Sequence, residues 1–559
     1  MFRRLLLVLV VSAAVPALAA NAPVRATHGM VVSQNAIASQ VGADVLAEGG
    51  SAVDAAVATA FALAVTHPTA GNIGGGGFLV HRSRSGEAVA YDFREVGPSG
   101  SHPGMWLRDG EYDPQLHHMS HVSVGVPGTV AGLYMAWQDE GRLPWPRLVE
   151  PAVKLARDGF TVTHGLAASL QRVLPRMQPY PASVAQFSRA GEPYQPGDLL
   201  VQEDLADSLQ RIADHGPAGF YRGKTAELIV AEMERGGGLI TLADLAAYQA
   251  KRRQPIVGDY RGYGVISMPP PSSGGVTLVQ MLNILEGYDI GALGFGTRAT
   301  LHRMIEAMRR GYADRAMTLG DPDFNPDLPV ARLTSKAYAQ QLRAGIDLEK
   351  ASVSDAAAHA GPAESPETTH LSVVDRERNA VALTYTLEWG YGSGIVVPGG
   401  GFLLNNEMGD FNAGPGLTTD QGLIGTPANL AEEGKRMLSS MTPTILTHEG
   451  ELFMVTGTPG GRTIINTVLQ TILNVVDHGM NAQTAVDAGR IHHQWLPDVV
   501  RYEVHGFSMD SLNGLRSMGH AIEERSQQGA AEVIVVNRAD GVLEGGVDRR
   551  PPDGGAAGH

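Results

Sequence analysis

One short run of this sequence has the residue types and the setting for nucleophilic chemistry. The run Glu367-Thr368-Thr369-His370 lies between two different segments. Before it, the small polar residues of 351–366 are typical of a mobile, exposed connection, and after it an alternating segment is typical of a β-strand. A threonine hydroxyl attacks a carbonyl group only when a base takes its proton, and the threonine's own α-amino group, with an ordinary pKa of about 7.7–8.0, can be that base. That amine is free only if the bond between Glu367 and Thr368 is cut. The pattern therefore predicts either a self-cleaving chain with Thr368 as nucleophile or an ordinary structural threonine.

The next pair of strands would place further polar residues beside this threonine. Thr368 and His370 share one face of an extended strand, because side chains alternate with a period of two. Thr386 and Glu388 share a face of the following strand, and the link 375–379 fits a hairpin. The hairpin would bring Thr386 beside Thr368, with Glu388 next along; otherwise Thr386 is an ordinary strand residue.

Two glycines have the setting of an oxyanion hole. A tetrahedral oxyanion needs two N–H donors aimed at it. Gly460-Gly461 lies between a predicted strand and a predicted apolar helix, 464–476, and backbone amides at the entry of a helix point toward an anion. The pair predicts such a hole, unless the glycines only form a tight turn.

Apolar periodicity predicts the elements that hold these residues. We expect helices at 36–48, 52–65, 276–285 and 464–476, and strands at 78–81, 88–93, 369–374, 380–388, 402–404, 443–447 and 452–456. Strands packed with helices on both sides predict an α/β or α+β layered fold.

Composition excludes several classes of function. The 559 residues are 43% hydrophobic and 18% charged, which are globular values. The net charge of −15 argues against nucleic acid as a partner, because that affinity depends on clustered Lys and Arg. Cysteine is absent, which excludes disulfides, thiolate metal sites and a cysteine nucleophile. The adjacent His492 and His493 do not form a metal motif, so we expect no metal and treat them as core or hydrogen-bonding residues.

The first residues have the pattern of a signal peptide. Arg3 and Arg4 are followed by an apolar run, and Ala17-Leu18-Ala19 fits a small-residue cleavage site. We expect residues 1–19 to be a signal peptide and the protein to be exported, to the periplasm. The alternative is an uncleaved anchor, but the apolar run is shorter than the roughly 20 residues of a membrane span.

The segment 367–375 closely resembles the γ-glutamyltranspeptidases, and the likeness covers nearly the whole chain after residue 19. Its supporting stretches are Ile73–Phe78, Tyr91–Glu95, Pro127–Gly132, Met268–Gly275, Tyr312–Arg315, Leu319–Phe324, Leu404–Met408, Leu438–Met441, Thr458–Gly461 and His492–Pro497. The resemblance implies an α+β fold, the αββα four-layer sandwich of N-terminal nucleophile hydrolases. It also implies self-cleavage into a large subunit, 20–367, and a small subunit, 368–559, which together form one unit.

The resemblance further assigns roles to individual residues. It implies that Thr368 is the nucleophile, that Thr386 orients it and that Gly460 and Gly461 form the oxyanion hole. The implied substrate-binding residues are Arg94, Ser439 and Ser440 for an α-carboxylate, and Glu388, Glu407 and Asp410 for an α-ammonium group. The implied activity is cleavage of γ-glutamyl amides such as glutathione, without a cofactor and with transfer of the acyl group to water, amino acids or peptides.

The chain departs from many bacterial relatives at three positions. Glu388 stands where they have Asn and Glu407 where they have Gln, although other relatives have acids at both positions. Gln421, in the lid loop 412–436, stands where some relatives have a gating Tyr. These changes leave lid closure and the balance of hydrolysis against transfer open. Two other functions remain to be weighed: an acylase for glutaryl side chains, against which the three acids argue, and an uncleaved binding protein, against which the intact catalytic residues argue.

Overall fold

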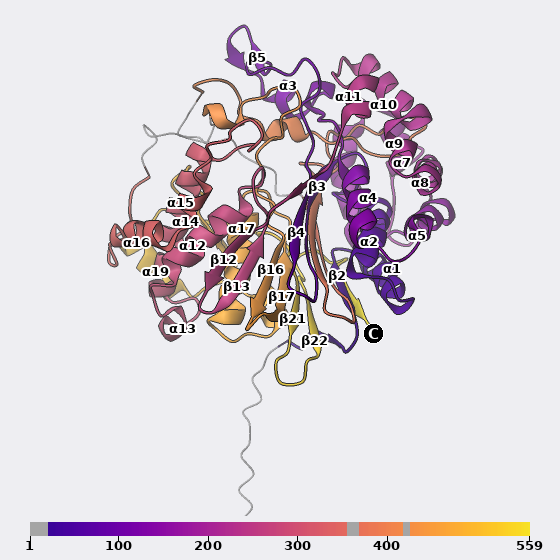
Figure 1. Ribbon diagram of the computed structural model, residues 1–559. Coiled ribbons are helices and arrows are strands. Elements are labelled where there is room, and N and C mark those ends of the chain that lie inside the picture. The colour runs from indigo at the N-terminus through magenta and orange to yellow at the C-terminus, as the bar shows by residue number, and fades with distance from the viewer. Residues whose placement is uncertain (1–20, 355–367, 418–424) are drawn as a thin grey trace, which may run out of the picture.

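Two seven-stranded antiparallel sheets pack face to face, with helices on both outer sides (Figure 1). The computed structural model describes residues 21–354, 368–417 and 425–559. The predicted signal peptide, Glu367 and Gln421 lie outside the described residues. The layers confirm the α+β, αββα four-layer sandwich.

The first sheet contains the strand that begins directly after Thr368. Its order is β11-β4-β3-β15-β14-β2-β23. The bounds are β11 Lys251–Arg253, β4 Ala88–Phe93, β3 Gly76–Arg82, β15 Ala380–Thr386, β14 Thr369–Val374, β2 Met30–Ser33 and β23 Gly555–Gly558.

The second sheet contains the strand that leads to Gly460. Its order is β1-β22-β21-β17-β16-β13-β12. The bounds are β1 Val24–Ala26, β22 Leu543–Val547, β21 Glu532–Val536, β17 Glu451–Gly457, β16 Thr444–His448, β13 Tyr263–Ser267 and β12 Ile256–Tyr260.

One helical layer covers the first sheet, and another covers the second (Figure 1). The first layer comprises α1 Ala36–Ala47, α2 Ala52–Thr66, α4 Thr129–Glu140, α5 Trp145–Asp158, α6 His164–Met177, α7 Pro181–Phe187, α8 Glu203–His215, α9 Ala218–Tyr221, α10 Gly223–Gly236 and α11 Leu242–Ala247. The second comprises α12 Gly274–Leu285, α13 Ile290–Leu293, α14 Arg298–Thr318, α15 Val330–Leu333, α16 Lys336–Ala344, α17 Thr463–Val476, α18 Ala482–Asp487 and α19 Met509–Ser517.

Short elements complete the described chain. Two of them matter for the site: the five-residue helix α3, Pro114–His118, and the 3₁₀ turn η3, Glu407–Asp410. The others are β5 Leu107–Arg108, β6 Glu111–Tyr112, β7 Phe160–Thr161, β8 Ser188–Arg189, β9 Glu192–Pro193, β10 Leu199–Leu200, β18 Ile491–His492, β19 Val500–Glu503, β20 Ile522–Arg525, η1 His121–Ser123 and η4 Pro427–Asn429.

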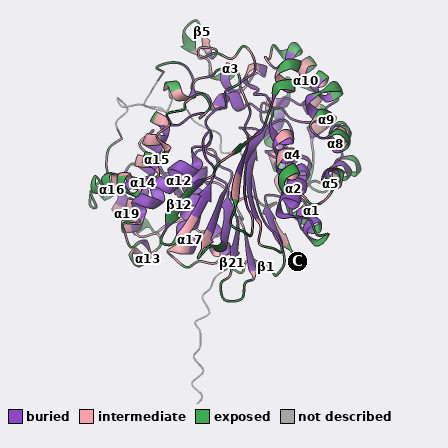
Figure 2. Cartoon of the chain, viewed as in Figure 1, coloured by how far each residue is buried: buried purple, intermediate pink, exposed green. Residues whose placement is uncertain are grey.

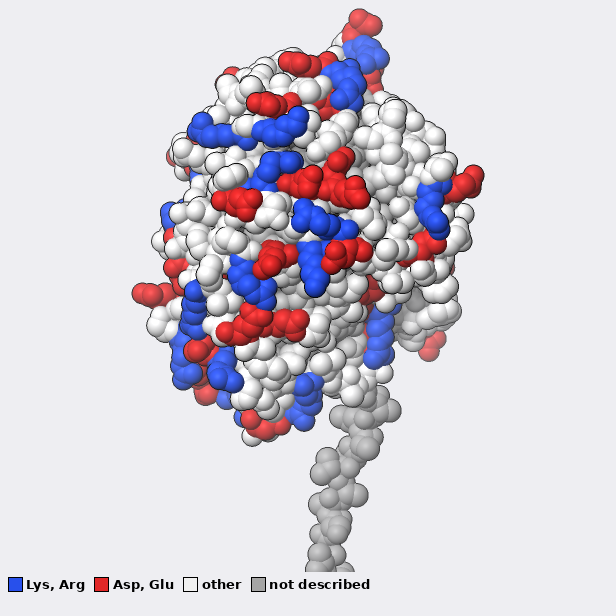
Figure 3. Space-filling model, turned by 90° about the vertical axis from the view of Figure 1, so that its right-hand side faces the viewer, with Lys and Arg blue, Asp and Glu red and all other residues white. Residues whose placement is uncertain are grey.

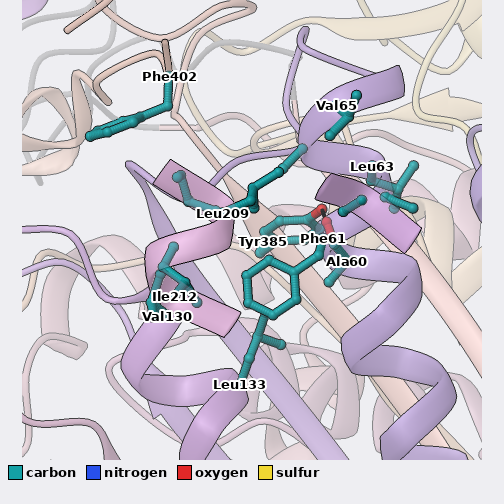
Figure 4. Close-up of a cluster of buried hydrophobic side chains, with 14 of the residues drawn as sticks. Ala60, Phe61, Leu63, Val65, Val130, Leu133, Leu209, Ile212, Tyr385 and Phe402 are labelled. Carbon is teal, nitrogen blue, oxygen red and sulfur yellow. Dashed lines mark hydrogen bonds between the residues drawn. The ribbon is translucent and has the colours of Figure 1, made fainter. Parts of the chain in front are cut away.

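Alternation along the strands explains the layering. In β15, Val381, Leu383 and Tyr385 join the core under the first helical layer, whereas Ala380 and Ala382 join the core between the sheets. Every residue of this strand is buried, and its first four residues are apolar. The strands of the two sheets are mostly buried, whereas the outer helices carry exposed positions (Figure 2). Figure 4 shows the first of these cores, where Tyr385 lies beside side chains from α2, α4 and α8.

The sequence explains where α2, the helix next to this core, begins and where the preceding helix α1 ends. Ser51 caps the first turn of α2 by accepting the N–H of Asp54, and the Asp54 carboxylate accepts the N–H of Ser51. Gly49 ends the preceding helix with a φ of +95°, a conformation that favours glycine. All fifteen residues of α2 are buried, which explains its lack of charged residues other than Asp54.

Three expectations differ from the structure in detail. The strand expected at 380–388 ends at Thr386, because Glu388 adopts a left-handed φ of +76°. The strand expected at 402–404 is a single bridge between Val396 and Leu403. Of the stretch 351–366, the described residues 351–354 are held against the fold: the Ala351 N–H donates to the Met518 carbonyl at 2.8 Å.

The surface and the helices bear on possible partners. On the face drawn in Figure 3, basic and acidic side chains are interspersed and form no broad basic patch. Within the described part of the chain, no helix has the length and apolar character needed to cross a membrane.

Candidate active site

The predicted site residues line one cavity at the ends of the central strands. It encloses about 260 Å³ of empty volume. Its lining residues are Arg94, Thr368, Thr386, Glu388, Glu407, Asp410, Ser439, Ser440, Met441, Gly461 and Ile464. Of the predicted residues that the structure describes, Gly460 is absent from this lining, although it directly precedes Gly461.

Thr368 and Thr386 meet across the hairpin as expected. The register of β14 and β15 pairs Thr369 with Tyr385, and this places the two threonines opposite each other. Thr368 Oγ1 donates to Thr386 Oγ1 at 3.4 Å, and both residues are buried. Thr386 Oγ1 also accepts the N–H of Glu388 at 2.9 Å, so the strand end is fixed around this hydroxyl.

The two glycines occupy the turn between β17 and α17. Gly460 has a φ of +138° and Gly461 a φ of +54°. A Cβ on Gly460 would lie 2.3 Å from Thr463 Oγ1, so a larger residue would displace the start of the helix. Gly461 lines the cavity at the entry of α17, where helix amides favour negative charge.

Arg94 is buried at the centre of the charged part of the cavity. Its guanidinium forms ion pairs with Glu407 and Asp410 and donates to the carbonyls of Met437 and Leu438, each at 3.3 Å. Burial alone would lower the pKa of Arg94, but the neighbouring carboxylates raise it above its ordinary value. The arginine therefore stays charged while it is bound by acids on both sides.

The acids of the cavity do not behave as ordinary surface carboxylates. Burial raises the pKa of Glu407 well above its ordinary value; the Arg94 guanidinium opposes the rise, and the neighbouring carboxyl groups add to it. Burial also raises the pKa of Glu95, whose Oε2 lies 3.8 Å from Arg94, to about 8. Near neutral pH, Glu95 is therefore mostly protonated.

The two serines are held by residues to which sequence reasoning gave no role. Ser440 Oγ accepts a hydrogen bond from Arg315 at 2.8 Å, and Arg315 also donates to Ser273 Oγ at 2.8 Å. Ser439 Oγ accepts the N–H of Met441 at 3.1 Å. Ser273 and Arg315 belong to stretches that carried the family resemblance, and this was the available signal.

The ring nitrogens of His370, two residues after Thr368, are directed away from it. His370 Nδ1 lies 2.8 Å from Thr384 Oγ1, and its Nε2 lies 3.1 Å from Ser372 Oγ. Burial lowers the pKa of His370 to about 3, so the ring is neutral at neutral pH. These contacts give His370 a structural role in the sheet.

The histidines considered for metal binding are engaged in hydrogen bonds. His492 Nδ1 lies 2.7 Å from Asn466 Nδ2, and His493 Nε2 lies 3.0 Å from Asp498 Oδ1.

Elsewhere in the described chain, His302, Glu306 and His520 lie close enough together to hold an ion. The carboxylate of Glu306 is already paired with Arg309 and Arg310, whose positive charges oppose a cation there.

The fold and the site together define the class of protein. A four-layer αββα sandwich with a threonine at the start of a central strand, facing a charged cavity, is the architecture of an N-terminal nucleophile hydrolase. Residues 38–558 match the model of the γ-glutamyltranspeptidase family. The chain belongs to this family.

Individual relatives agree with this assignment. The chain is 50% identical over 544 residues to the glutathione hydrolase proenzyme of Escherichia coli K12, covering 96% of this chain and 93% of the relative. Among solved structures it resembles a cephalosporin acylase from Bacillus halodurans, with a TM-score of 0.84, 28% identity and 99% coverage of both chains. It also resembles the Helicobacter pylori γ-glutamyltranspeptidase, with a TM-score of 0.56, 46% identity and coverage of 56% of this chain and 91% of the other.

Proposed function

We propose that this protein is a self-processing γ-glutamyltransferase and glutathione hydrolase. Thr368 Oγ1 attacks the γ-carbonyl carbon while the free α-amino group of Thr368 takes the hydroxyl proton. The amides of Gly460 and Gly461 hold the oxyanion. Collapse of the intermediate breaks the amide bond, and the leaving amine takes the proton. Water, an amino acid or a peptide then attacks the γ-glutamyl-threonine ester and restores the hydroxyl.

The cavity lining is the observation that carries this proposal. The lining includes Thr368 together with one buried arginine and three carboxyl groups, those of Glu388, Glu407 and Asp410. A γ-glutamyl group has one α-carboxylate and one α-ammonium at the end opposite its reactive carbonyl. A cation and several acids beside the nucleophile complement those two charges.

Binding of such a zwitterion would exchange ion pairs. Arg94 is bound to Glu407 and Asp410, so a substrate carboxylate approaches a guanidinium that already has anionic partners. The substrate ammonium brings a new cation to those acids while its carboxylate binds the arginine. Ser439 and Ser440 supply hydroxyl groups at the same end of the cavity. Each buried charge thus keeps a partner, which limits the desolvation cost.

The environment of the nucleophile favours the α-amino group as the base. His370 is neutral, and its ring nitrogens contact Thr384 and Ser372. Thr386 contacts the Thr368 hydroxyl and has no basic group, so its role is orientation. These contacts support maturation by cleavage before Thr368.

The topology supports a stable pair of subunits, residues 20–367 and 368–559. In the first sheet, β15 and β14 lie between β3 and β2, so strands of the proposed small subunit separate strands of the large one. In the second sheet, β16 of the small subunit pairs with β13 of the large one. Cutting one peptide bond leaves both sheets intact. A signal peptide at 1–19 and a periplasmic location complete the proposal and rest on the N-terminal sequence pattern.

The acylase alternative has a specific observation in its favour, because one similar solved structure is a cephalosporin acylase. A glutaryl group lacks the ammonium, so its carboxylate would enter a cavity with three acids and gain no cation for them. Initial rates with matched γ-glutamyl and glutaryl anilides decide between the two functions. We expect γ-glutamyl cleavage to dominate; equal rates would favour the acylase.

Two further measurements complete the test. Addition of a dipeptide acceptor separates transfer from hydrolysis, because an acceptor that attacks the ester faster than water speeds turnover and so the release of the aniline. A denaturing gel of the active protein addresses the uncleaved binding-protein alternative. We expect two bands, and one band in an inactive sample would contradict the proposed function.

A further inference from the structure

Glu388 is contacted from outside the cavity by a residue that the proposed reaction does not use. The helix α3 ends at His118, which is buried. His118 Nδ1 lies 3.2 Å from Glu388 Oε1. The imidazole stacks on Trp389 with ring centroids 5.3 Å apart and planes 12° apart. His118 is not part of the cavity lining, so it contacts the lining acid from behind.

The neighbouring groups fix where the histidine protons lie. His117 Nε2 lies 3.1 Å from the Met408 carbonyl, which only accepts, so Nε2 carries the proton and Nδ1 is an acceptor. The Tyr112 hydroxyl lies 3.0 Å from that Nδ1 and donates to it. An ionised Glu388 only accepts, so His118 Nδ1, at 3.2 Å, is the donor of that pair. The Nε2 of the neutral ring then has no proton and lies 3.4 Å from the oxygen of Tyr112, whose proton goes to His117. A chain of contacts thus joins the Met408 carbonyl to Glu388.

Burial keeps both imidazole rings neutral. It lowers the pKa of His118 to about 4 and the pKa of His117 well below its ordinary value. Near neutral pH each ring is therefore neutral and has one N–H. In His118 that single N–H is directed at Glu388.

The turn that carries two other cavity acids packs against the same histidine. Asn406 Nδ2 donates to the His118 carbonyl at 3.1 Å, and Asn406 Oδ1 accepts the Trp389 N–H at 3.1 Å. A Cβ on Gly409 would lie 2.3 Å from His118 Nδ1 and 2.8 Å from Glu388 Oε1. Only glycine fits at this position of η3, so the imidazole of His118 and the carboxyl group of Glu388 are closely confined.

We propose that His118 is a positioning residue that fixes the Glu388 carboxyl group for recognition of the substrate's α-ammonium group. This inference rests on the proposed function and adds a determinant of donor specificity. Glu388, Glu407 and Asp410 crowd one cavity and repel one another when ionised. A donor behind Glu388 offsets that repulsion and holds one oxygen, which leaves the carboxyl group oriented toward the cavity.

Three substitutions of His118 separate the effect of its N–H from the effect of its aromatic ring. His118→Phe keeps an aromatic ring on Trp389 but removes the donor. His118→Asn places an amide N–H near the position of Nδ1, and His118→Gln places it near the position of Nε2. Tyr112→Phe is the matched control, because it removes the next hydroxyl and leaves the donor to Glu388. All rates are divided by the amount of mature enzyme, which is measured from the small-subunit band on a gel.

We expect His118→Phe to raise KM for a γ-glutamyl anilide about tenfold and to change kcat less. A tenfold change corresponds to the free energy of one hydrogen bond to a charged group. The preference for the γ-glutamyl over the glutaryl anilide should narrow by a similar factor. His118→Asn should recover most of this loss, and Tyr112→Phe should cause a smaller one. If the phenylalanine variant does not mature, His118→Gln should give the same increase in KM.

A double-mutant cycle tests whether His118 acts through Glu388. In a Glu388→Gln background, His118→Phe should raise KM by less than about twofold. The same large increase in both backgrounds, or equal losses for the two anilides, would overturn the role of His118 while the proposed function stands. A wild type that does not cleave the γ-glutamyl anilide would overturn the proposed function, and this inference with it.

Discussion

Replacing Arg94 by lysine tests the charge arrangement of the cavity. The guanidinium binds two carboxyl groups through different nitrogens and is buried. A lysine ammonium keeps the charge but has no planar fork, so it cannot reproduce both contacts and a bidentate contact to a substrate carboxylate. At least one charge-assisted hydrogen bond is lost, which costs about 1.5–3 kcal/mol.

This loss corresponds to a decrease in kcat/KM of about 10- to 100-fold for a γ-glutamyl anilide, mostly through KM. The assay is the initial rate as a function of anilide concentration with mature Arg94→Lys enzyme. Arg94→Met is the control for charge, because it leaves Glu407 and Asp410 without their cation. We expect it to reduce the free energy of unfolding by about 3–5 kcal/mol, which a lower thermal midpoint would show. Unchanged kinetic constants in the lysine variant would refute the contact between Arg94 and the substrate.

The remaining predictions concern maturation, the oxyanion hole and pH. Thr368→Ala should remain one inactive chain, and the small wild-type chain should begin Thr-Thr-His-Leu; another start would contradict the mechanism. Gly460→Ala keeps the backbone N–H, but its Cβ would clash with Thr463 Oγ1 and shift the amides of the oxyanion hole. We expect kcat, measured on mature enzyme, to fall by about 10²–10³-fold, the effect of losing one donor, with less change in KM. The pKa of Glu95 is raised from 4.5 to about 8, so the folded state binds the extra proton and stability should fall as pH rises through that interval. Urea midpoints at pH 5 and pH 8 in the uncleaved Thr368→Ala chain should show this fall, and Glu95→Gln should reduce it.

The hairpin that begins at Thr368 could be predicted from the sequence, because its geometry depends on neighbouring residues. Alternation with a period of two fixes which side chains share a face, and a short link fixes the register, so Thr386 lies opposite Thr368 as expected. The strand was expected to continue to Glu388, but Glu388 turns with a left-handed φ. Glu388 still lines the cavity, but the turn of the backbone places it there and not the alternation of a strand.

Contacts between distant parts of the chain could not be predicted in this way. Arg94 meets Glu407 and Asp410 across 313 and 316 residues, and no periodicity relates those positions. His118 lies in a helix of five residues, too short for a recognisable apolar pattern. Its role depends on the packing of α3 against η3, which only the folded chain reveals.

The cavity's charges suggest why the acids and the arginine occur together. A γ-glutamyl donor adds one positive and one negative charge and leaves the local net charge unchanged, whereas a glutaryl donor adds only a negative one. Glu388, Glu407 and Asp410 make the second case unfavourable, since no new cation reaches them. With neutral residues at 388 and 407, fewer acids would oppose an added anion. We therefore expect the two glutamates to increase discrimination between the donors, at the cost of crowding carboxyl groups in a buried space. In the proposed arrangement the hydrogen bond from His118 to Glu388 offsets part of that cost.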